Sequence, residues 1–371
     1  MMARESIHYP KSVKPSQSQP DPEDSIMLTI LIAVVIAFAF VMIAMPSTIR
    51  MLIEKGRTGI DVHKPEKPAI PKGGGIIMLF AVVTTLLIVI GITTFQEQEV
   101  VAPGLMAALV SILMAGLIGL LDDNLDFRNR TKIALPLLAS IPMVAMSVGT
   151  PTMSLPVIGT VNLGILYPLV VVPLMTTFII DATNMYAGMN GLEAGLASVN
   201  SSALVVYVVL SPFFTLESNT QGQIDAATIA GALLGASIAF LVFNRYPAKV
   251  LSGDVGLLPM GATMAAALIL GNMDRLAAIL FVTYLANFLM YIIYRIHVKR
   301  SGAKYAKFAS PRPDGTLEVA GPYTMYWLLP YFSKRITEKK NVMLLVLLQA
   351  VLAYSGVLLL LFAYPLGIGW L

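Results

Sequence analysis

The sequence predicts an all-α protein that crosses a membrane about ten times. Three observations support this fold class. Of the 371 residues, 57% are hydrophobic and only 12% are charged. A soluble domain usually carries about 25% charged residues, so the deficit indicates a polytopic membrane protein. The third observation is a series of apolar runs, each of about the length that crosses the hydrocarbon core of a bilayer.

Ten apolar runs follow one another along the chain. Two of them are short, and in one of these Pro136 and Pro142 predict a kinked helix. The polar, Pro- and Ser-rich residues 1–25 predict a disordered tail, followed by a single transmembrane domain over residues 26–371. The predicted spans are 26–45, 75–94, 103–121, 133–148, 163–180, 191–210, 226–243, 257–271, 276–294 and 342–362.

Basic residues concentrate in alternate loops. Of the 25 lysines and arginines, 21 lie in loops of one set, within residues 47–73, 122–132, 244–256 and 295–341. The positive-inside rule predicts that these loops are cytoplasmic and that both termini lie outside. A surface that binds phosphates would have the same charge, so the two explanations agree in sign. Nearly all the unusual polar residues lie on this side as well.

The composition also restricts the metal chemistry. The chain has no cysteine, which excludes disulfides and thiolate zinc sites, and its three histidines are scattered. Any metal must therefore be held by oxygen ligands, which favours a hard cation such as Mg²⁺.

The densest polar cluster is residues 181–195, at the end of an apolar run. It contains Asp181, Asn184, Asn190 and Glu193, with glycines that include Gly188. Carboxylates and amides are costly in lipid, so we expect these side chains to face a polar cavity. The alternative is a polar contact between helices, with the glycines allowing close packing.

A second acidic motif ends the third span. Asp122, Asp123 and Asp126 lie within five residues and are followed by three basic residues, the last of which is Lys132. On a helix these carboxylates would share a face and repel one another. A bound cation or the basic residues must offset that repulsion. The alternative is a helix end that is solvated among lipid headgroups.

Three further loops on the basic side have candidate chemistry. Asp254 follows Gly253 at the start of an apolar helix, where the dipole would keep a metal-binding carboxylate ionised, although Asp is also an ordinary N-cap. The loop that contains Lys64 ends in three glycines, which suits an anion site or only a stiff basic loop. Residues 295–341 hold ten basic residues, including Lys304 and Lys307, which could bind phosphates, sugar hydroxyls or lipid headgroups.

Together these segments resemble the polyprenyl-phosphate N-acetylhexosamine-1-phosphate transferase superfamily. Within it the sequence is most similar to archaeal and eukaryotic UDP-GlcNAc–dolichyl-phosphate GlcNAc-1-phosphotransferases. The resemblance rests on Lys64 and the Ile-Pro and glycine of residues 70–75, and on the motifs LDDNLDFRNRTK (121–132), NMYAGMNGLEAG (184–195), FNRYPAKVLSGD (243–254) and PDGTLEV (313–319).

The resemblance implies roles for individual residues. Asn184 and Asp254 match the ligands of Mg²⁺, for which Mn²⁺ could substitute. Asp122 and Asp123 match a catalytic aspartate pair, whose first member is often proposed to activate the lipid phosphate. Lys132 matches a phosphate-binding lysine.

Other residues are expected to bind the substrates. Asn190 and Gly188 lie where the uracil is held, and Lys64 matches a basic residue near the active site. Asp126 stands where the dolichol branch tends to have Asn. Lys304 and Lys307 fall roughly where a His-Arg cluster contacts the sugar in eukaryotic members, and this chain lacks that cluster.

The implied reaction transfers a sugar 1-phosphate from a UDP-N-acetylhexosamine to a polyprenyl or dolichyl phosphate and releases UMP. The expected location is the plasma membrane of a prokaryote, with a cytoplasmic active site, a homodimer as one expected form, and no nucleic-acid partner. One alternative is a bacterial-type enzyme that uses undecaprenyl phosphate. Another is a transporter, but the polar residues lie at span ends and we find no internal repeat, whereas transporters often have midplane sites and two similar halves.

Overall fold

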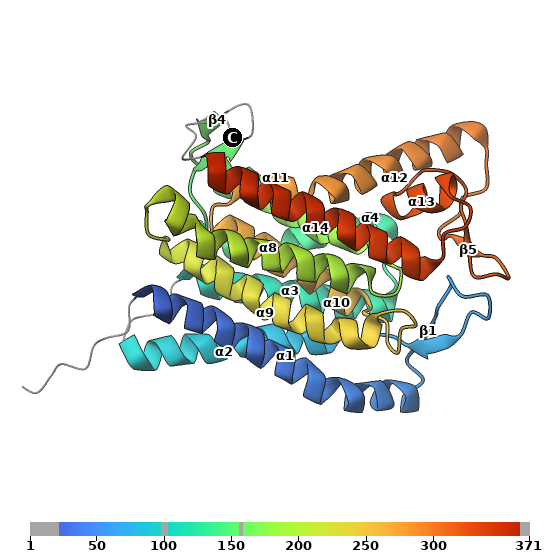
Figure 1. Ribbon diagram of the computed structural model, residues 1–371, viewed down its shortest axis with the longest axis horizontal. Helices are drawn as coiled ribbons and strands as arrows, with labels where there is room; N and C mark the ends of the chain where they lie inside the picture. Colours follow the sequence, from blue (N-terminus) through green and yellow to red (C-terminus); the bar gives the residue numbers. More distant parts are fainter. Residues whose placement is uncertain (1–21, 98–102, 156–158, 364–371) are drawn as a thin grey trace, which may run out of the picture.

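The computed structural model describes residues 22–97, 103–155 and 159–363, and within these ranges the chain forms an elongated bundle of helices (Figure 1). The predicted helical membrane class is confirmed. Residues 1–21 of the predicted tail lie outside the described part. Helix α1 begins at Pro22, three residues before the predicted end of the tail at residue 25.

Among the described residues, nine long helices build the bundle and shorter helices connect them. The long helices are α1 (Pro22–Glu54), α2 (Gly75–Glu97), α3 (Pro103–Leu125), α7 (Val172–Met185), α8 (Leu192–Thr215), α9 (Gln221–Asn244), α10 (Asp254–Leu270), α12 (Val282–Ser301) and α14 (Glu338–Ala363). The short ones are α4 (Asn129–Ala134), α5 (Pro136–Ala139), α6 (Ile141–Ala145), the π-helical turn η1 (Tyr167–Val171), α11 (Asp274–Leu280) and α13 (Met325–Phe332).

Fewer spans than predicted meet the requirements of length and composition. Among the described residues, seven helices are long and apolar enough to cross a membrane, or eight if α11 and α12, bent by 55°, form one span. The predicted span 133–148 is divided among α4, α5 and α6, because Pro136 and Pro142 lack the N–H that would continue a helix. Helix α10 is apolar, but its 17 residues are too few.

In the part of the chain that the structure describes, three short antiparallel hairpins add a small amount of β-structure to the predicted all-α fold. The strands are β1 (Thr58–Ile60) with β2 (Ala69–Pro71), β3 (Thr152–Leu155) with β4 (Gly159–Asn162), and β5 (Ser310–Pro311) with β6 (Leu317–Glu318). β1 and β5 lie at one end of the bundle together with α13, whereas β4 lies at the other end (Figure 1). We call the end with β1 and β5 the loop end.

Helix α10 is the central helix of the bundle. It packs against α2, α3, α7 and α9, and every residue from Val255 to Ile269 is buried. Small residues allow this close packing: a Cβ added to Gly119 of α3 would overlap the backbone of Asp254. The end of α3 and the start of α10 therefore touch through their backbones, and this contact brings three aspartates together.

A second close contact joins α1 to α9. A Cβ added to Gly235 of α9 would overlap the carbonyl oxygen of Val34, whereas one added to Gly91 of α2 would have no atom within 4 Å. In a close-packed interior an extra methyl group forces the neighbouring backbone to move.

We predict that Gly235→Ala destabilises the bundle by about 1–3 kcal/mol, because α1 and α9 must separate to make room for the methyl group. Gly91→Ala makes the same chemical change in a helix with open space around it and should leave stability unchanged or slightly raise it. Thermal unfolding of the purified protein in detergent measures both effects. Equal unfolding midpoints for the two variants would contradict the packing.

Candidate functional site

Two charged clusters lie at the loop end of the bundle. The first, which we call the aspartate cluster, consists of Asp122 and Asp123 at the end of α3, Asp254 at the start of α10, Lys132 of α4 and Lys72 just before α2. The predicted catalytic and metal-binding carboxylates of α3 and α10 therefore come together.

Two lysines offset the charge of these carboxylates. The Nζ of Lys132 lies 3.0 Å from Oδ1 of Asp122 and 3.8 Å from Oδ2 of Asp254, and 3.4 Å from Oδ1 of the exposed Asp126. The Nζ of Lys72 lies 2.9 Å from Oδ1 of Asp123. Burial alone would lower the pKa of both lysines, but their hydrogen bonds to Asp122 and Asp123 and the nearby negative charge outweigh it. Both pKa values are raised, so both lysines remain cationic at neutral pH.

Backbone groups fix the orientation of the two α3 aspartates. Oδ2 of Asp123 accepts the N–H of Val255 in the first turn of α10, at 3.0 Å, and Oδ1 of Asp122 accepts the N–H of Phe127, also at 3.0 Å. Gly253 has φ +73°, and a Cβ there would lie 2.6 Å from Oδ2 of Asp123. A glycine before Asp254 is therefore required both by the backbone conformation and by the approach of a carboxylate.

A cavity of about 360 Å³ borders the aspartate cluster, and Lys132 lines it. Asn184 and Asp181, from the end of α7, line the same cavity, as does Lys307 from the loop after α12. Helices α7 and α10 pack together, which brings the end of α7 to the level of the start of α10. The carboxylate and amide oxygens at this end are the ligands that a hard cation prefers.

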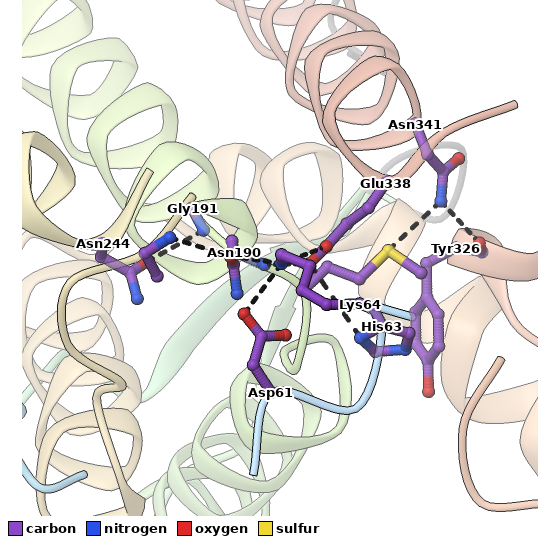
Figure 2. Close-up of polar contacts among 11 residues, drawn as sticks. Asp61, His63, Lys64, Asn190, Gly191, Asn244, Tyr326, Glu338 and Asn341 are labelled. Carbon is purple, nitrogen blue, oxygen red and sulfur yellow. Dashed lines mark hydrogen bonds and ion pairs between the residues drawn. The ribbon is translucent and has the colours of Figure 1, made fainter. Parts of the chain in front are cut away.

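The second cluster surrounds a buried lysine (Figure 2). We call it the Lys64 hub; its side chains are Asp61, Lys64, Asn190 and Glu338. The Nζ of Lys64 lies 2.8 Å from Oδ2 of Asp61, 2.5 Å from Oε2 of Glu338 and 2.6 Å from Oδ1 of Asn190. All four residues are at most 6% exposed, so solvent does little to screen these charges.

The Lys64 hub joins segments that are far apart in the sequence. Oδ1 of Asn190 also accepts the N–H of Ala248 at 2.9 Å, and the N–H of Asn190 donates to Oε1 of Glu338 at 2.8 Å. The loop after β1, the loop after α7, the loop after α9 and the start of α14 are thereby connected. Beside the hub, Asn244 accepts the N–H of Gly191 and donates to the carbonyl of Val250, which holds the same loops (Figure 2).

Sequence reasoning did not single out Glu338, and it assigned no role to Asn244, although Asn244 lies in the motif of residues 243–254. The only available signal for Glu338 is an acidic residue just before the apolar run 342–362, which also fits a solvated helix end. Glu193, to which no role was assigned, is buried and accepts the hydroxyl of Ser252 at 3.0 Å. It therefore supports the contact between α8 and the loop before α10.

The Lys64 hub does not have the character of a metal site. Ligand atoms of Asp61, His63 and Glu338 come within 4.8 Å of one another. However, the ammonium of Lys64 already contacts both carboxylates, and a second cation would be repelled there. Burial lowers the pKa of His63 to about 4, so its ring is neutral at neutral pH.

The structure divides the sequence-predicted residues into three groups. Asp122, Asp123, Asp126, Lys132 and Asp254 meet at the aspartate cluster, with Asn184 and Lys307 beside Lys132 on the cavity wall. Lys64 and Asn190 meet at the Lys64 hub. Gly188 and Lys304 are exposed, and neither lines the 360 Å³ cavity.

The fold and these clusters define an integral membrane protein whose charged groups gather at one end of a helical bundle, around a cavity lined by lysine, aspartate and asparagine. Residues 105–272 match the profile of glycosyl transferase family 4. With the relatives described next, this match shows that the chain belongs to glycosyl transferase family 4. The matched range runs from α3 to the end of α10 and includes the three aspartates of the cluster.

Relatives from two archaea and one bacterium match most of the chain. A protein of Saccharolobus solfataricus, provisionally named UDP-N-acetylglucosamine–dolichyl-phosphate N-acetylglucosaminephosphotransferase, is 32% identical over 71% of this chain and 76% of its own length. A protein of Sulfolobus acidocaldarius with the same provisional name is 33% identical, over 67% and 73% respectively. The phospho-N-acetylmuramoyl-pentapeptide-transferase of Clostridium botulinum is 31% identical, over 72% and 82%.

We predict that Glu338→Gln destabilises the protein by about 2 kcal/mol, because it weakens two hydrogen bonds that the buried carboxylate accepts, from Nζ of Lys64 and from the N–H of Asn190. The matched control is Glu318→Gln, which removes an exposed carboxylate 3.5 Å from Arg312 and should change stability by less than about 0.5 kcal/mol. Thermal unfolding in detergent compares the two variants. A Glu338→Gln protein as stable as the control would show that the hub contributes little to the fold.

Proposed function

We propose that the protein transfers N-acetylglucosamine 1-phosphate, or a related N-acetylhexosamine 1-phosphate, from a UDP-sugar to a polyprenyl phosphate of the dolichyl type. The main observation in support is Lys132, which contacts the carboxylates of α3 and α10 and also lines the cavity that Asn184 and Lys307 share. A cation placed between metal-binding oxygens and a cavity suits a diphosphate substrate. The provisional names of the archaeal relatives support the same reaction.

In the proposed reaction, an oxygen of the lipid phosphate attacks the β-phosphorus of the UDP-sugar. The bond from that phosphorus to the bridging oxygen breaks, and UMP leaves with this oxygen. Phosphoryl transfer depends mainly on positioning and on neutralising charge. The lysines and aspartates of the cluster would serve those two purposes.

The donor set fits Mg²⁺, with Mn²⁺ as a substitute. Asp254 and Asn184 would hold the ion, because they present a carboxylate and an amide oxygen at the same end of two packed helices. When bound, the ion would neutralise the diphosphate of the UDP-sugar. Its net positive charge would also relieve the repulsion among Asp122, Asp123 and Asp254, which Lys72 and Lys132 only partly offset.

The contacts of Asp122 favour a positioning role over that of a general base. Its Oδ1 already interacts with Lys132 and with the N–H of Phe127. The last proton of a phosphomonoester has a pKa of about 6, so much of the acceptor is already dianionic at neutral pH. Asp122 would therefore orient Lys132 toward the cavity, and Lys132 would balance the charge of the phosphates.

For the nucleotide, the Lys64 hub suggests how Asn190 would act. Its Oδ1 is already occupied by Lys64 and by the N–H of Ala248, so only its amide hydrogens remain for a ligand. Asn190 would thus donate to a uracil carbonyl, and Lys64 would hold the asparagine in place. Gly188, exposed at φ +106° in the same loop, would allow the base to approach the backbone.

The basic loops support a cytoplasmic active site at the loop end, and the archaeal relatives support the plasma membrane of a prokaryote. A bacterial-type transfer to undecaprenyl phosphate is the second candidate. It is favoured by the similarly high identity to the Clostridium botulinum transferase.

The reaction class and its metal site can be tested in one assay. With Mg²⁺, UDP-GlcNAc and dolichyl phosphate, the purified protein should release UMP, whereas release of UDP would mean ordinary glycosyl transfer and exclude this proposal. Parallel reactions with UDP-MurNAc-pentapeptide and undecaprenyl phosphate test the second candidate.

At saturating Mg²⁺, Asp254→Asn and Asn184→Ala should each lose at least about 100-fold in turnover, since charge stabilisation in the transition state is worth about that much. Glu217→Gln, at an exposed site remote from these loops, is the control and should keep normal turnover.

Two neighbouring lysines provide a test of the cavity. Lys307 lines it and Lys304 does not, although both are exposed and lie in the same loop. Lys307→Ala should raise the KM for the UDP-sugar about 5- to 10-fold, because it removes one partly screened charge contact to the substrate. Lys304→Ala should leave KM within twofold of the original. Equal KM values for the two variants would place the sugar phosphate elsewhere.

A further inference from the structure

We propose that a groove formed by α8, α9 and α14 binds a membrane lipid with an anionic phosphate headgroup, at a site distinct from the aspartate cluster. The groove encloses about 630 Å³. Its walls are mainly apolar side chains of α14, including Met343 and Leu347, which are 62% and 58% exposed. In a membrane protein such exposed side chains face lipid, so the groove lies within reach of hydrocarbon chains.

The rim of the groove at the loop end has two cationic side chains. Arg245, just after α9, and Lys339, in the first turn of α14, both line the groove and are exposed. Within residues 22–97, 103–155 and 159–363, neither has an ion pair with an acidic group. An apolar channel that ends at two unpaired cations is complementary to a phosphate headgroup with its hydrocarbon chains.

The other possible occupants fit less well. A second copy of the chain in a two-fold arrangement would bring the same cations to the same rim, where they would repel one another. The lipid substrate of the proposed reaction would need its phosphate at the aspartate cluster, and none of the three aspartates of that cluster lines the groove. An anionic lipid that is bound but not consumed is consistent with both observations.

The groove also borders the Lys64 hub. Asn190 and Tyr246 line it, and the Nζ of Lys64 lies 4.4 Å from the centre of the Tyr246 ring. A headgroup held by Arg245 would restrain the loop after α9, which carries both Tyr246 and the N–H of Ala248 that donates to Asn190. Lipid binding should therefore stabilise the same loops that the hub connects.

The test is native mass spectrometry of the full-length protein, delipidated and then incubated with phosphatidylglycerol or phosphatidylcholine. We expect a one-to-one adduct that forms with phosphatidylglycerol at least tenfold more readily than with phosphatidylcholine. The double variant Arg245→Gln/Lys339→Gln removes both rim charges and should weaken the phosphatidylglycerol adduct about 30-fold. This follows because each basic residue near an anionic lipid contributes about 1 kcal/mol to binding. The matched control, Arg50→Gln/Arg300→Gln, removes two exposed charges that do not line the groove and should change the adduct less than twofold.

A second variant separates shape from charge. Ala350→Trp keeps both cations and fills the apolar part of the groove, so it should also weaken the adduct at least tenfold. The unfolding temperature without lipid shows whether each variant is folded, and added phosphatidylglycerol should raise it for the parent protein and for the charge control only.

Equal adducts in the parent and in the rim variant would overturn the proposal. So would a shift from dimer to monomer in both groove variants without a change in lipid binding, which would assign the groove to a second copy. None of these measurements uses enzymatic activity, so their outcome is independent of the proposed reaction.

Discussion

The ammonium of Lys64 is held within 2.8 Å of two carboxylates and an asparagine side chain, almost completely out of contact with solvent. A charge buried in this way is stable only if its partners remain in place, because without them it would be uncompensated in a poorly polarisable interior. The partners come from two loops and the first turn of α14, and Asn190 joins a third loop through the N–H of Ala248. The geometry of these loops therefore depends on one set of electrostatic contacts, and one of them, the loop after α7, also lines the 360 Å³ cavity through Ala187.

The aspartate cluster solves a different physical problem. Its carboxylates repel one another, and they are brought together by packing instead of by attraction. Gly119 allows the backbone of α3 to touch the start of α10, and Gly253 allows Asp123 to reach the N–H of Val255. The apolar burial of α10 supplies the free energy that holds these like charges together. Lys72 and Lys132 offset part of the repulsion, and the residual negative charge is the reason that we propose a cation there.

We assign different roles to the two clusters at the loop end: the Lys64 hub fixes the loops, and the aspartate cluster is the proposed site of the reaction. The Lys64 hub is buried, and both of its carboxylates contact the same ammonium, which suits a part that must not move. The aspartate cluster is only partly compensated, and it borders a cavity in which Lys132, Asn184 and Lys307 reach a shared space. The groove along α14 is lined in part by Asn190 of the hub, so a lipid bound there, as we propose, would contact the structure that connects the loops.

Much of this arrangement was predictable from the sequence because it follows from composition and local pattern. The apolar runs determine the membrane class, and the motifs around Asp122, Asn184 and Asp254 indicate a site at one end of the spans. Local pattern could not show that residues 133–148 form three short helices, or that the 17 apolar residues of α10 lie at the centre of the bundle. It also could not assign Glu338 to Lys64, 274 residues apart. An acidic residue at a helix start looks the same whether it is solvated or buried, and only the packing of α14 against the loops decides which charge it meets.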